Sequence, residues 1–239
     1  MGTGFCVVLT FNDGQIILLT EVIVLSKTTL YLIRHGESQG NAVRSFLGHT
    51  NLDLSQKGHM QAEMTANYLK NIHADVIYSS DLLRAYNTAK HTADLKGMDI
   101  IKNEKLREIY AGDWENIKFD ELLEKYPHTY AVLWKTDVGN SRPDNGESVA
   151  ELKKRVSDEI TKIAKENISK TIFIFTHATP IRTFCAFCEN KSLDDIKVIP
   201  WASNASVTKV EYVDDKFNMI EYGNDSFMGD LSTSLPPSV

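Results

Sequence analysis

The stretch that decides the fold is Thr28-Thr29-Leu30-Tyr31-Leu32-Ile33-Arg34-His35-Gly36, a compact apolar run that ends abruptly in two basic residues. Residues 28–33 are typical of a strand buried on both faces, as in a parallel sheet. In open parallel sheets the ligand crevice lies beyond the carboxyl ends of the strands. We therefore expect Arg34 and His35 to stand at the edge of the sheet where a ligand binds.

Two more apolar runs end in polar side chains in the same way. Residues 75–78 are followed by Ser79-Ser80-Asp81, and residues 171–175 are followed by Thr176-His177. Between and after these runs, apolar residues recur at helical spacing. Four helices are expected. The first begins at Ser55, the second runs from Leu82 to Leu95 with Ser80 or Asp81 as N-cap, the third covers residues 148–166, and the fourth begins with Pro180. Strands that alternate with helices predict an α/β fold with a mostly parallel sheet covered on both faces.

The chain is predicted to hold one main domain, residues 27–225, with an extra segment at each end. Residues 1–26 carry two apolar, β-branched runs around Asn12-Asp13-Gly14 and predict an N-terminal β-hairpin. This hairpin is either native or vector-derived, and its free edge could pair with a second copy in a homodimer. Residues 226–239 are expected to form a loose C-terminal tail.

A turn-rich insertion interrupts the main domain at about residues 116–145. It contains a predicted helix from Glu121 to Trp134 and is expected to form a helical cap over the crevice. Residues 207–213 and 217–222 predict a hairpin that closes the domain.

The composition limits the kinds of partner. Of the 239 residues, 42% are hydrophobic and 24% charged, which is ordinary for a globular protein with a sizeable core. The net charge of −6 argues against a nucleic-acid partner, which needs clustered cations, but not against a small anionic ligand. Asp13 and Glu21 interrupt the apolar N-terminal segment, so neither a signal peptide nor a membrane helix is predicted. We expect a cytoplasmic protein with no membrane partner.

Cysteines predict neither a disulfide framework nor a metal site. The chain has three, and Cys185 and Cys188 are spaced as C-x-x-C. No second cysteine pair or nearby histidine pair completes a zinc site. Two buried helix cysteines are favoured over redox or metal chemistry.

The polar residues at the strand ends suit phosphoryl transfer through a histidine. A neutral histidine such as His35 can attack phosphorus if an acceptor holds its other ring nitrogen. Arg34 and Arg84 are placed to bind the phosphoryl oxygens, and His177 can donate a further hydrogen bond. Glu108 is the best candidate for the acid that protonates the leaving oxygen. Each residue alone has an ordinary structural explanation, so the prediction depends on their joint arrangement.

The chain resembles the histidine phosphatase superfamily, the phosphoglycerate-mutase-like proteins, over roughly residues 28–213. Six ordered segments carry the resemblance, and the first of them contains the R-H-G-E opening at residues 34–37. The matching residues run from Leu32 to Asn41, from Asp53 to Ala62, from Ser79 to Ala89, from Leu106 to Glu115, and through Asn145-Gly146-Glu147-Ser148 and Thr176 to Arg182.

The resemblance implies a three-layer α/β/α sandwich that needs no metal or other cofactor. It implies that His35 is the phosphorylated nucleophile and Glu108 the proton donor. The phosphate pocket then consists of the residues that match the family's binding positions: Arg34, Arg84, His177, Asn41 and Ala178. Ala178 stands where the family usually has glycine.

Three functions remain open on the sequence alone, all with a small phosphorylated substrate as partner. Gly112-Asp113-Trp114-Glu115 resembles the broad phosphatase branch, and Leu47 replaces a hydroxyl residue common in the mutases, so a phosphatase is favoured. The alternatives are a cofactor-dependent phosphoglycerate mutase and a non-catalytic phosphate-binding protein. Arg142 and Trp134 of the cap are candidates for substrate contacts, Arg142 for a second anionic group.

Overall fold

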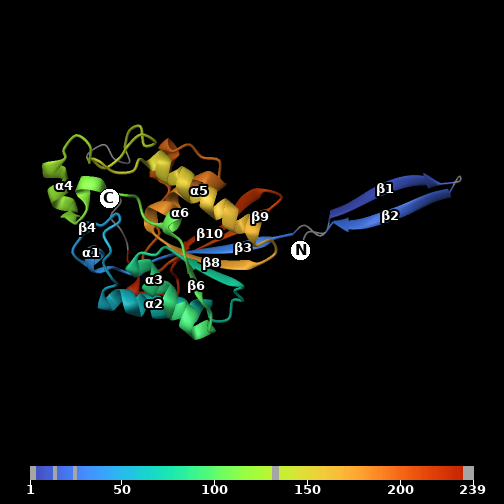
Figure 1. The fold of residues 1–239 in the computed structure, drawn as a ribbon, viewed down its shortest axis with the longest axis horizontal. Coiled ribbons are helices and arrows are strands. Elements are labelled where there is room, and N and C mark those ends of the chain that lie inside the picture. Colours follow the sequence, from blue (N-terminus) through green and yellow to red (C-terminus); the bar gives the residue numbers. More distant parts are fainter. Residues whose placement is uncertain (1–3, 13–14, 24–25, 131–134, 234–239) are drawn as a thin grey trace.

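The centre of the molecule is a six-stranded sheet with the spatial order β10-β9-β3-β8-β5-β6 (Figure 1). The structure, a computed structural model, describes residues 4–12, 15–23, 26–130 and 135–233. The strands of the sheet are β3 (Thr28–Arg34), β5 (Val76–Ser79), β6 (Ile100–Lys102), β8 (Thr171–Thr176), β9 (Val207–Val213) and β10 (Lys216–Asn224). Strands β3, β8, β5 and β6 run parallel, whereas β9 and β10 form an antiparallel hairpin along β3. The predicted mostly parallel sheet is confirmed.

The register of the sheet aligns the ends of the three predicted strands. Arg34 pairs with Thr176 across β3 and β8, and Ser79 pairs with Phe175 across β5 and β8. The residues that follow these strands therefore leave the sheet at one level and along one edge. His35 and His177 each come directly after such an end.

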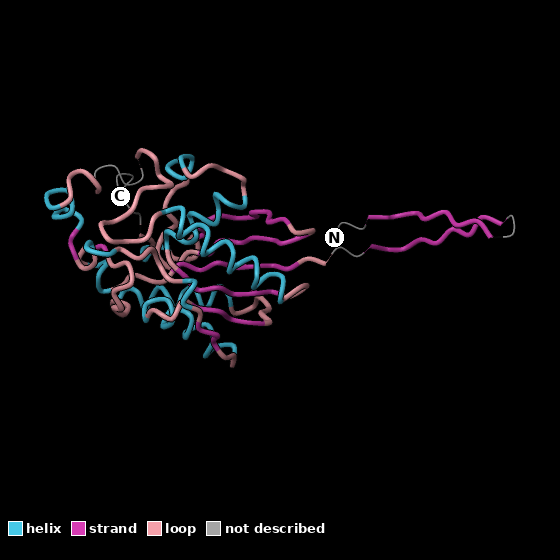
Figure 2. The backbone as a smooth tube through the Cα atoms, turned by 45° about the horizontal axis from the view of Figure 1, so that its top comes forward, coloured by secondary structure: helices cyan, strands magenta, loops and turns pink. Residues whose placement is uncertain are grey.

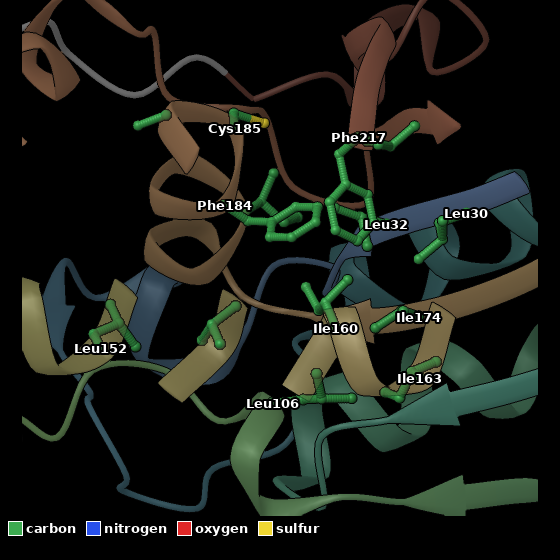
Figure 3. Close-up of a cluster of buried hydrophobic side chains, with 14 of the residues drawn as sticks. Leu30, Leu32, Leu106, Leu152, Ile160, Ile163, Ile174, Phe184, Cys185 and Phe217 are labelled. Carbon is green, nitrogen blue, oxygen red and sulfur yellow. The ribbon is translucent and has the colours of Figure 1, made fainter. Parts of the chain in front are cut away.

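Side-chain alternation in β3 divides the core into two layers. Leu30 and Leu32 pack with α5 (Val149–Glu166) and α6 (Ala178–Cys188), as Figure 3 shows. Tyr31 and Ile33 point to the other face, which α2 (Gln56–Leu69) and α3 (Leu83–Lys96) cover (Figure 1). Burying one such aliphatic side chain contributes about 1.5–3 kcal/mol. The expected three-layer α/β/α sandwich is confirmed.

Two predicted helix starts agree with the structure. Ser55 caps α2, and its hydroxyl accepts from the Gly58 N–H at 3.0 Å. Ser148 and Glu151 form a capping box at the start of α5. These side chains satisfy N–H groups that have no partner within the helix.

The predicted N-cap of α3 is wrong, although the helix begins within one residue of the expected position. Its N-cap is Leu82, which provides no side-chain hydrogen bond. Ser80 and Asp81, the expected caps, are engaged elsewhere: Ser80 bonds His177, and Asp81 pairs with Arg107. Ser80 therefore contacts a candidate site residue and Asp81 forms an ion pair, and neither caps the helix.

The α6 start is also displaced from the prediction. The helix begins at Ala178, and Pro180 is its third residue rather than its first. Proline is still tolerated there, because N–H groups in the first turn have no partner in the helix.

The cap is built from a short helix and a two-stranded ribbon. Helix α4 (Phe119–Lys125) follows β7 (Ile117–Lys118), which pairs with β4 (Ser45–Phe46) beside the four-residue helix α1 (Gln39–Ala42). The predicted helix to Trp134 is too long, because Tyr126 ends it and Pro127 disfavours helical conformation at the preceding residue. Trp134 itself lies outside the described residues.

The N-terminal hairpin is present, as predicted. Strand β1 (Gly4–Asn12) pairs antiparallel with β2 (Gln15–Ile23) along their full length. Figures 1 and 2 show the hairpin extending away from the helix and sheet layers. Among the described helices, none combines the length and apolar character that crossing a bilayer requires.

Residues 226–233 differ from the loose tail that the sequence predicts. The Phe227 ring stacks on Tyr68 at a centroid distance of 4.2 Å, and Met228 is buried. Gln61 donates to the Leu231 carbonyl at 2.7 Å. An aromatic and a methionine that bury apolar surface hold this segment against α2, although its composition is polar.

Gly58 allows α2 to pack directly on the loop after β3. A Cβ atom at Gly58 would lie 1.9 Å from the Glu37 carbonyl oxygen, a backbone atom that cannot rotate away. We expect Gly58→Ala to lower the free energy of unfolding by about 1–3 kcal/mol, although alanine favours helix. Urea unfolding measures this change, with the exposed α2 substitution Glu63→Ala as control. Unchanged or higher stability of Gly58→Ala would contradict the close approach.

Candidate active site

A cavity of about 250 Å³ opens at the carboxyl edge of the parallel strands. Six of the predicted site residues line it: Arg34, His35, Asn41, Arg84, Glu108 and Ala178. His177 is fully buried, and its ring centroid lies 5.1 Å from that of His35. The structure therefore brings together the nucleophile, acid and phosphate-pocket candidates.

The His35 ring is held in one tautomer. Its Nδ1 lies 2.6 Å from the Gly36 carbonyl oxygen. Since a carbonyl only accepts hydrogen bonds, Nδ1 carries the proton, and Nε2 keeps its lone pair. Burial, reinforced by the charges of Arg84 and Arg34, lowers the pKa of His35 well below its usual value. The imidazole is thus neutral at neutral pH, as a nucleophile must be.

Two buried guanidinium groups flank this imidazole. Arg84 donates to the carbonyl oxygens of Thr50 and Gly48, both at 2.8 Å, and Arg34 donates to that of Ala202 at 2.5 Å. Burial lowers the pKa of each arginine to about 10, so both stay charged at neutral pH. The buried Nε of Arg34 has no partner within the described part of the chain. A buried donor without a partner is costly, and a bound oxyanion would satisfy it.

His177 has one ring nitrogen engaged and one open. Its Nε2 lies 2.8 Å from Ser80 Oγ, and its buried Nδ1 has no partner among the described residues. Ser80 Oγ also accepts from the Leu82 N–H at 3.4 Å, and its own proton can be donated to Nε2. Nδ1 then bears the ring proton and can donate to a phosphoryl oxygen. Burial and the charge of Arg84 lower the pKa of His177 as well, which favours this neutral form.

Glu108 lies in a loop between two short 3-10 helices (Glu104–Leu106 and Gly112–Trp114), and it lines the cavity. One carboxylate oxygen accepts from its own neighbour, the Ile109 N–H, at 2.8 Å. The other accepts from the Thr179 N–H at 3.3 Å, in the first turn of α6. These contacts place a carboxyl group at the wall of the cavity that Arg34, His35 and Arg84 also line.

The two lesser pocket candidates also lie at the cavity. Asn41 belongs to a capping box with Ser38, and its Oδ1 also accepts from Asn204 at 3.4 Å. Ala178 is the first residue of α6, where helix N–H groups are free to bind an anion. The methyl group of Ala178 fits at this position, although the resemblance implies glycine.

The arginine at the cavity mouth differs from the one predicted on the cap, and several cavity residues were not predicted. Arg142 pairs with Glu151 at 3.5 Å and is not among the residues that line the cavity. The arginine at the mouth is Arg44, an exposed residue held at a φ of 59°. Other lining residues were not predicted for the site: Glu37, Phe119, Trp201, Asn204 and Thr233. Glu37 belongs to the R-H-G-E opening, but no spacing or motif marks the other four, because the cap, the loop before β9 and the C-terminal segment bring them together.

The cysteines of α6 take no part in the cavity. Cys185 is fully buried, and burial raises its pKa well above the usual range. Burial also raises the pKa of Cys188 to about 12. Thiols of this kind are poor nucleophiles and metal ligands, which supports the structural interpretation. In the described ranges, no group of three or more His, Cys, Asp or Glu side chains is placed to hold a metal ion.

Comparison with known proteins identifies the class that this fold and site define. Residues 30–225 match the model of the histidine phosphatase superfamily (branch 1). The chain therefore belongs to the histidine phosphatase superfamily, as the sequence predicts.

Individual relatives cover most of the chain. Phosphoserine phosphatase 1 of Hydrogenobacter thermophilus is 31% identical over 191 residues, which cover 80% of this chain and 89% of that protein. A 2,3-bisphosphoglycerate-dependent phosphoglycerate mutase of Bartonella tribocorum is 30% identical and covers 70% of this chain and 84% of its own. The structure of YhfR from Bacillus stearothermophilus superposes with a TM-score of 0.81 at 29% identity, over 84% of this chain and 99% of that one.

The two buried histidines predict a pH-dependent stability. Below pH 6.5 the unfolded chain protonates histidines that the folded chain keeps neutral, so the free energy of unfolding falls as the pH falls. Removing His35 should reduce the decrease in the free energy of unfolding between pH 6.5 and 5.5 by about 1 kcal/mol. Denaturant titrations of His35→Ala across this range measure it. His128→Ala, at an exposed site, should keep the parental slope. The same slope in His35→Ala would show that His35 is not buried in its neutral form.

Proposed function

We propose that the protein hydrolyses small phosphomonoesters through a phosphohistidine on His35. The observation that carries the proposal is the 2.6 Å contact between His35 Nδ1 and the Gly36 carbonyl, which leaves Nε2 as the nucleophile. The buried charges of Arg34 and Arg84 attract the phosphoryl group to this nitrogen. A phosphate dianion bound between the two guanidinium groups offsets the electrostatic repulsion between these buried cations.

The reaction proceeds in two displacements at phosphorus. In the first, His35 Nε2 forms a bond to phosphorus while the bond to the ester oxygen breaks, and the Glu108 carboxylic acid gives its proton to that oxygen. In the second, the Glu108 carboxylate takes a proton from water, and the hydroxyl oxygen bonds to phosphorus as the bond from phosphorus to Nε2 breaks. Arg34, Arg84 and the His177 Nδ1–H hold the transferring oxygens in both steps. The chain's own side chains supply all of these roles, so we propose a metal-independent reaction.

The phosphatase reading is favoured over the two alternatives. A mutase must hold a second phosphorylated acceptor, and the apolar Leu47 stands where the resemblance implies a hydroxyl residue. A non-catalytic binding protein has no need for the fixed tautomer of His35 or for a carboxylate at Glu108. Phosphoserine is the first substrate to test, because a relative that covers most of the chain is named for it.

His35→Ala should lower hydrolysis of p-nitrophenyl phosphate by at least about 10³-fold, because the nucleophile is lost. The parent should keep its activity in EDTA. It should also carry a phosphoryl group on His35 when turnover is quenched without acid, because acid hydrolyses phosphohistidine. Steady-state assays and mass spectrometry measure these outcomes. Chelator-sensitive turnover would contradict the metal-independent mechanism. Conversion of 3-phosphoglycerate into its 2-isomer in the presence of 2,3-bisphosphoglycerate would favour the mutase.

Arg44 should bind a second anionic group of the substrate. Its backbone N–H and carbonyl are bonded to Asn41 and Phe119, so its left-handed conformation is fixed at the cavity mouth. We expect Arg44→Ala to lower kcat/KM about five- to tenfold for phosphoserine but less than twofold for phosphoethanolamine, which lacks the carboxylate. Arg142→Ala serves as the matched control. Equal losses on both substrates would contradict this role.

A further inference from the structure

The loop that carries Glu108 is held by an arginine from another layer of the fold. Arg155 on α5 donates from Nη1 to the Lys105 carbonyl at 2.8 Å and to the Arg107 carbonyl at 3.1 Å. Its Nη2 donates to the carbonyl of Glu108 itself at 3.2 Å. One guanidinium group therefore fixes three backbone carbonyls within four consecutive residues.

Glu147 fixes the orientation of that guanidinium. Its two carboxylate oxygens accept from Arg155 Nε at 2.8 Å and Nη2 at 2.7 Å, a bidentate arrangement with strict geometry. Glu147 also contacts the far end of the loop, where its N–H donates to the Tyr110 carbonyl at 2.9 Å. The Tyr110 N–H returns a weaker hydrogen bond to the Glu147 carboxylate at 3.3 Å. The pair thus holds both flanks of Glu108.

The partners of Arg155 are backbone atoms and a carboxylate outside the cavity. Neither Arg155 nor Glu147 lines the cavity, so neither contacts a substrate bound there. Both side chains are largely buried, with exposed fractions of 22% and 15%. His49, in the loop after β4, adds a further anchor, because its Nε2 donates to the Glu108 carbonyl at 2.9 Å. The Glu108 carbonyl consequently has two donors, and rotation of its peptide is restricted.

We propose that Arg155, oriented by Glu147, is a positioning residue for the general acid. This inference rests on the proposed function of Glu108 as proton donor. A general acid acts only if its oxygen lies within hydrogen-bond reach of the leaving group, and a displacement of about 1 Å costs up to about 10² in rate. Backbone anchors at residues 105, 107 and 108 set where the carboxylate points. Within the described residues, neither Arg155 nor Glu147 forms a hydrogen bond with His35, His177 or the two buried arginines of the cavity.

The leaving group separates positioning from a merely structural role. p-Nitrophenolate leaves without help from an acid, whereas the alkoxide of phosphoserine requires a proton. We expect Arg155→Met to lower kcat/KM for phosphoserine by about 10–100-fold and for p-nitrophenyl phosphate by less than about threefold. Across a series of aryl phosphates, the rate of Arg155→Met should depend more steeply on the leaving-group pKa than the rate of the parent. A general loss of structure would lower kcat/KM equally for all substrates.

Four comparison variants complete the test. Glu108→Gln should show the same leaving-group dependence, and the double variant Glu108→Gln with Arg155→Met should be no slower on phosphoserine than Glu108→Gln alone. Arg155→Lys keeps the charge but loses the forked contacts, so its kcat/KM for phosphoserine should be close to that of Arg155→Met. Lys154→Met, whose exposed side chain pairs with Asp158 on α5, should match the parent.

The outcomes distinguish the two proposals. Leaving-group dependence in Glu108→Gln but equal losses on all substrates in Arg155→Met would overturn the positioning role and keep the acid. Additive effects in the double variant would also overturn it. An absence of leaving-group dependence in Glu108→Gln would overturn the acid assignment, and the positioning role with it. If Arg155→Met does not fold, Glu147→Gln and Arg155→Lys apply the same comparison with milder changes.

Discussion

The structure depends on two guanidinium groups held out of water at the edge of a parallel sheet. Arg34 and Arg84 are almost completely buried, and their fields act on the same imidazole. Backbone carbonyls of Gly48, Thr50 and Ala202 compensate part of the desolvation. The remaining positive field favours the neutral form of His35. In the proposed function the same field attracts the phosphoryl group, so one arrangement of charge serves both anion binding and the nucleophilic form of the histidine.

The register of the sheet determines where these groups lie. Alternation in Leu30-Tyr31-Leu32-Ile33 assigns each side chain to one layer, and a slip by one residue would exchange the layers. This pattern is local and could be read from the sequence, as could the strand ends at His35 and His177. The capping serines of α2 and α5 were predictable for the same reason, since a cap involves residues within one turn.

Features that depend on distant segments could not be predicted in this way. Ser80 looks like a helix cap, but its hydroxyl is turned to His177, which is 97 residues away. Arg44 reaches the cavity mouth through a left-handed backbone that neither glycine nor asparagine marks. The packing of Phe227 on Tyr68 joins positions far apart in the chain, and nothing in the composition of either segment indicates it.

In the proposed function, chemistry and specificity occupy different parts of the molecule. The phosphate pocket and nucleophile follow β3, β5 and β8, whose ends the sheet holds level. The mouth is formed by Arg44, Phe119, Trp201 and Thr233, from segments that belong to no common motif. Glu108 lies between the two parts, on a loop whose carbonyls are bound by α5 rather than by the sheet. Because the acid must meet the leaving group while the nucleophile meets phosphorus, a change in the mouth can alter which ester binds without disturbing the pocket. The anchored loop then fixes where any leaving oxygen has to lie for a proton to reach it, so the range of substrates is limited by geometry at Glu108 as well as by the walls of the mouth.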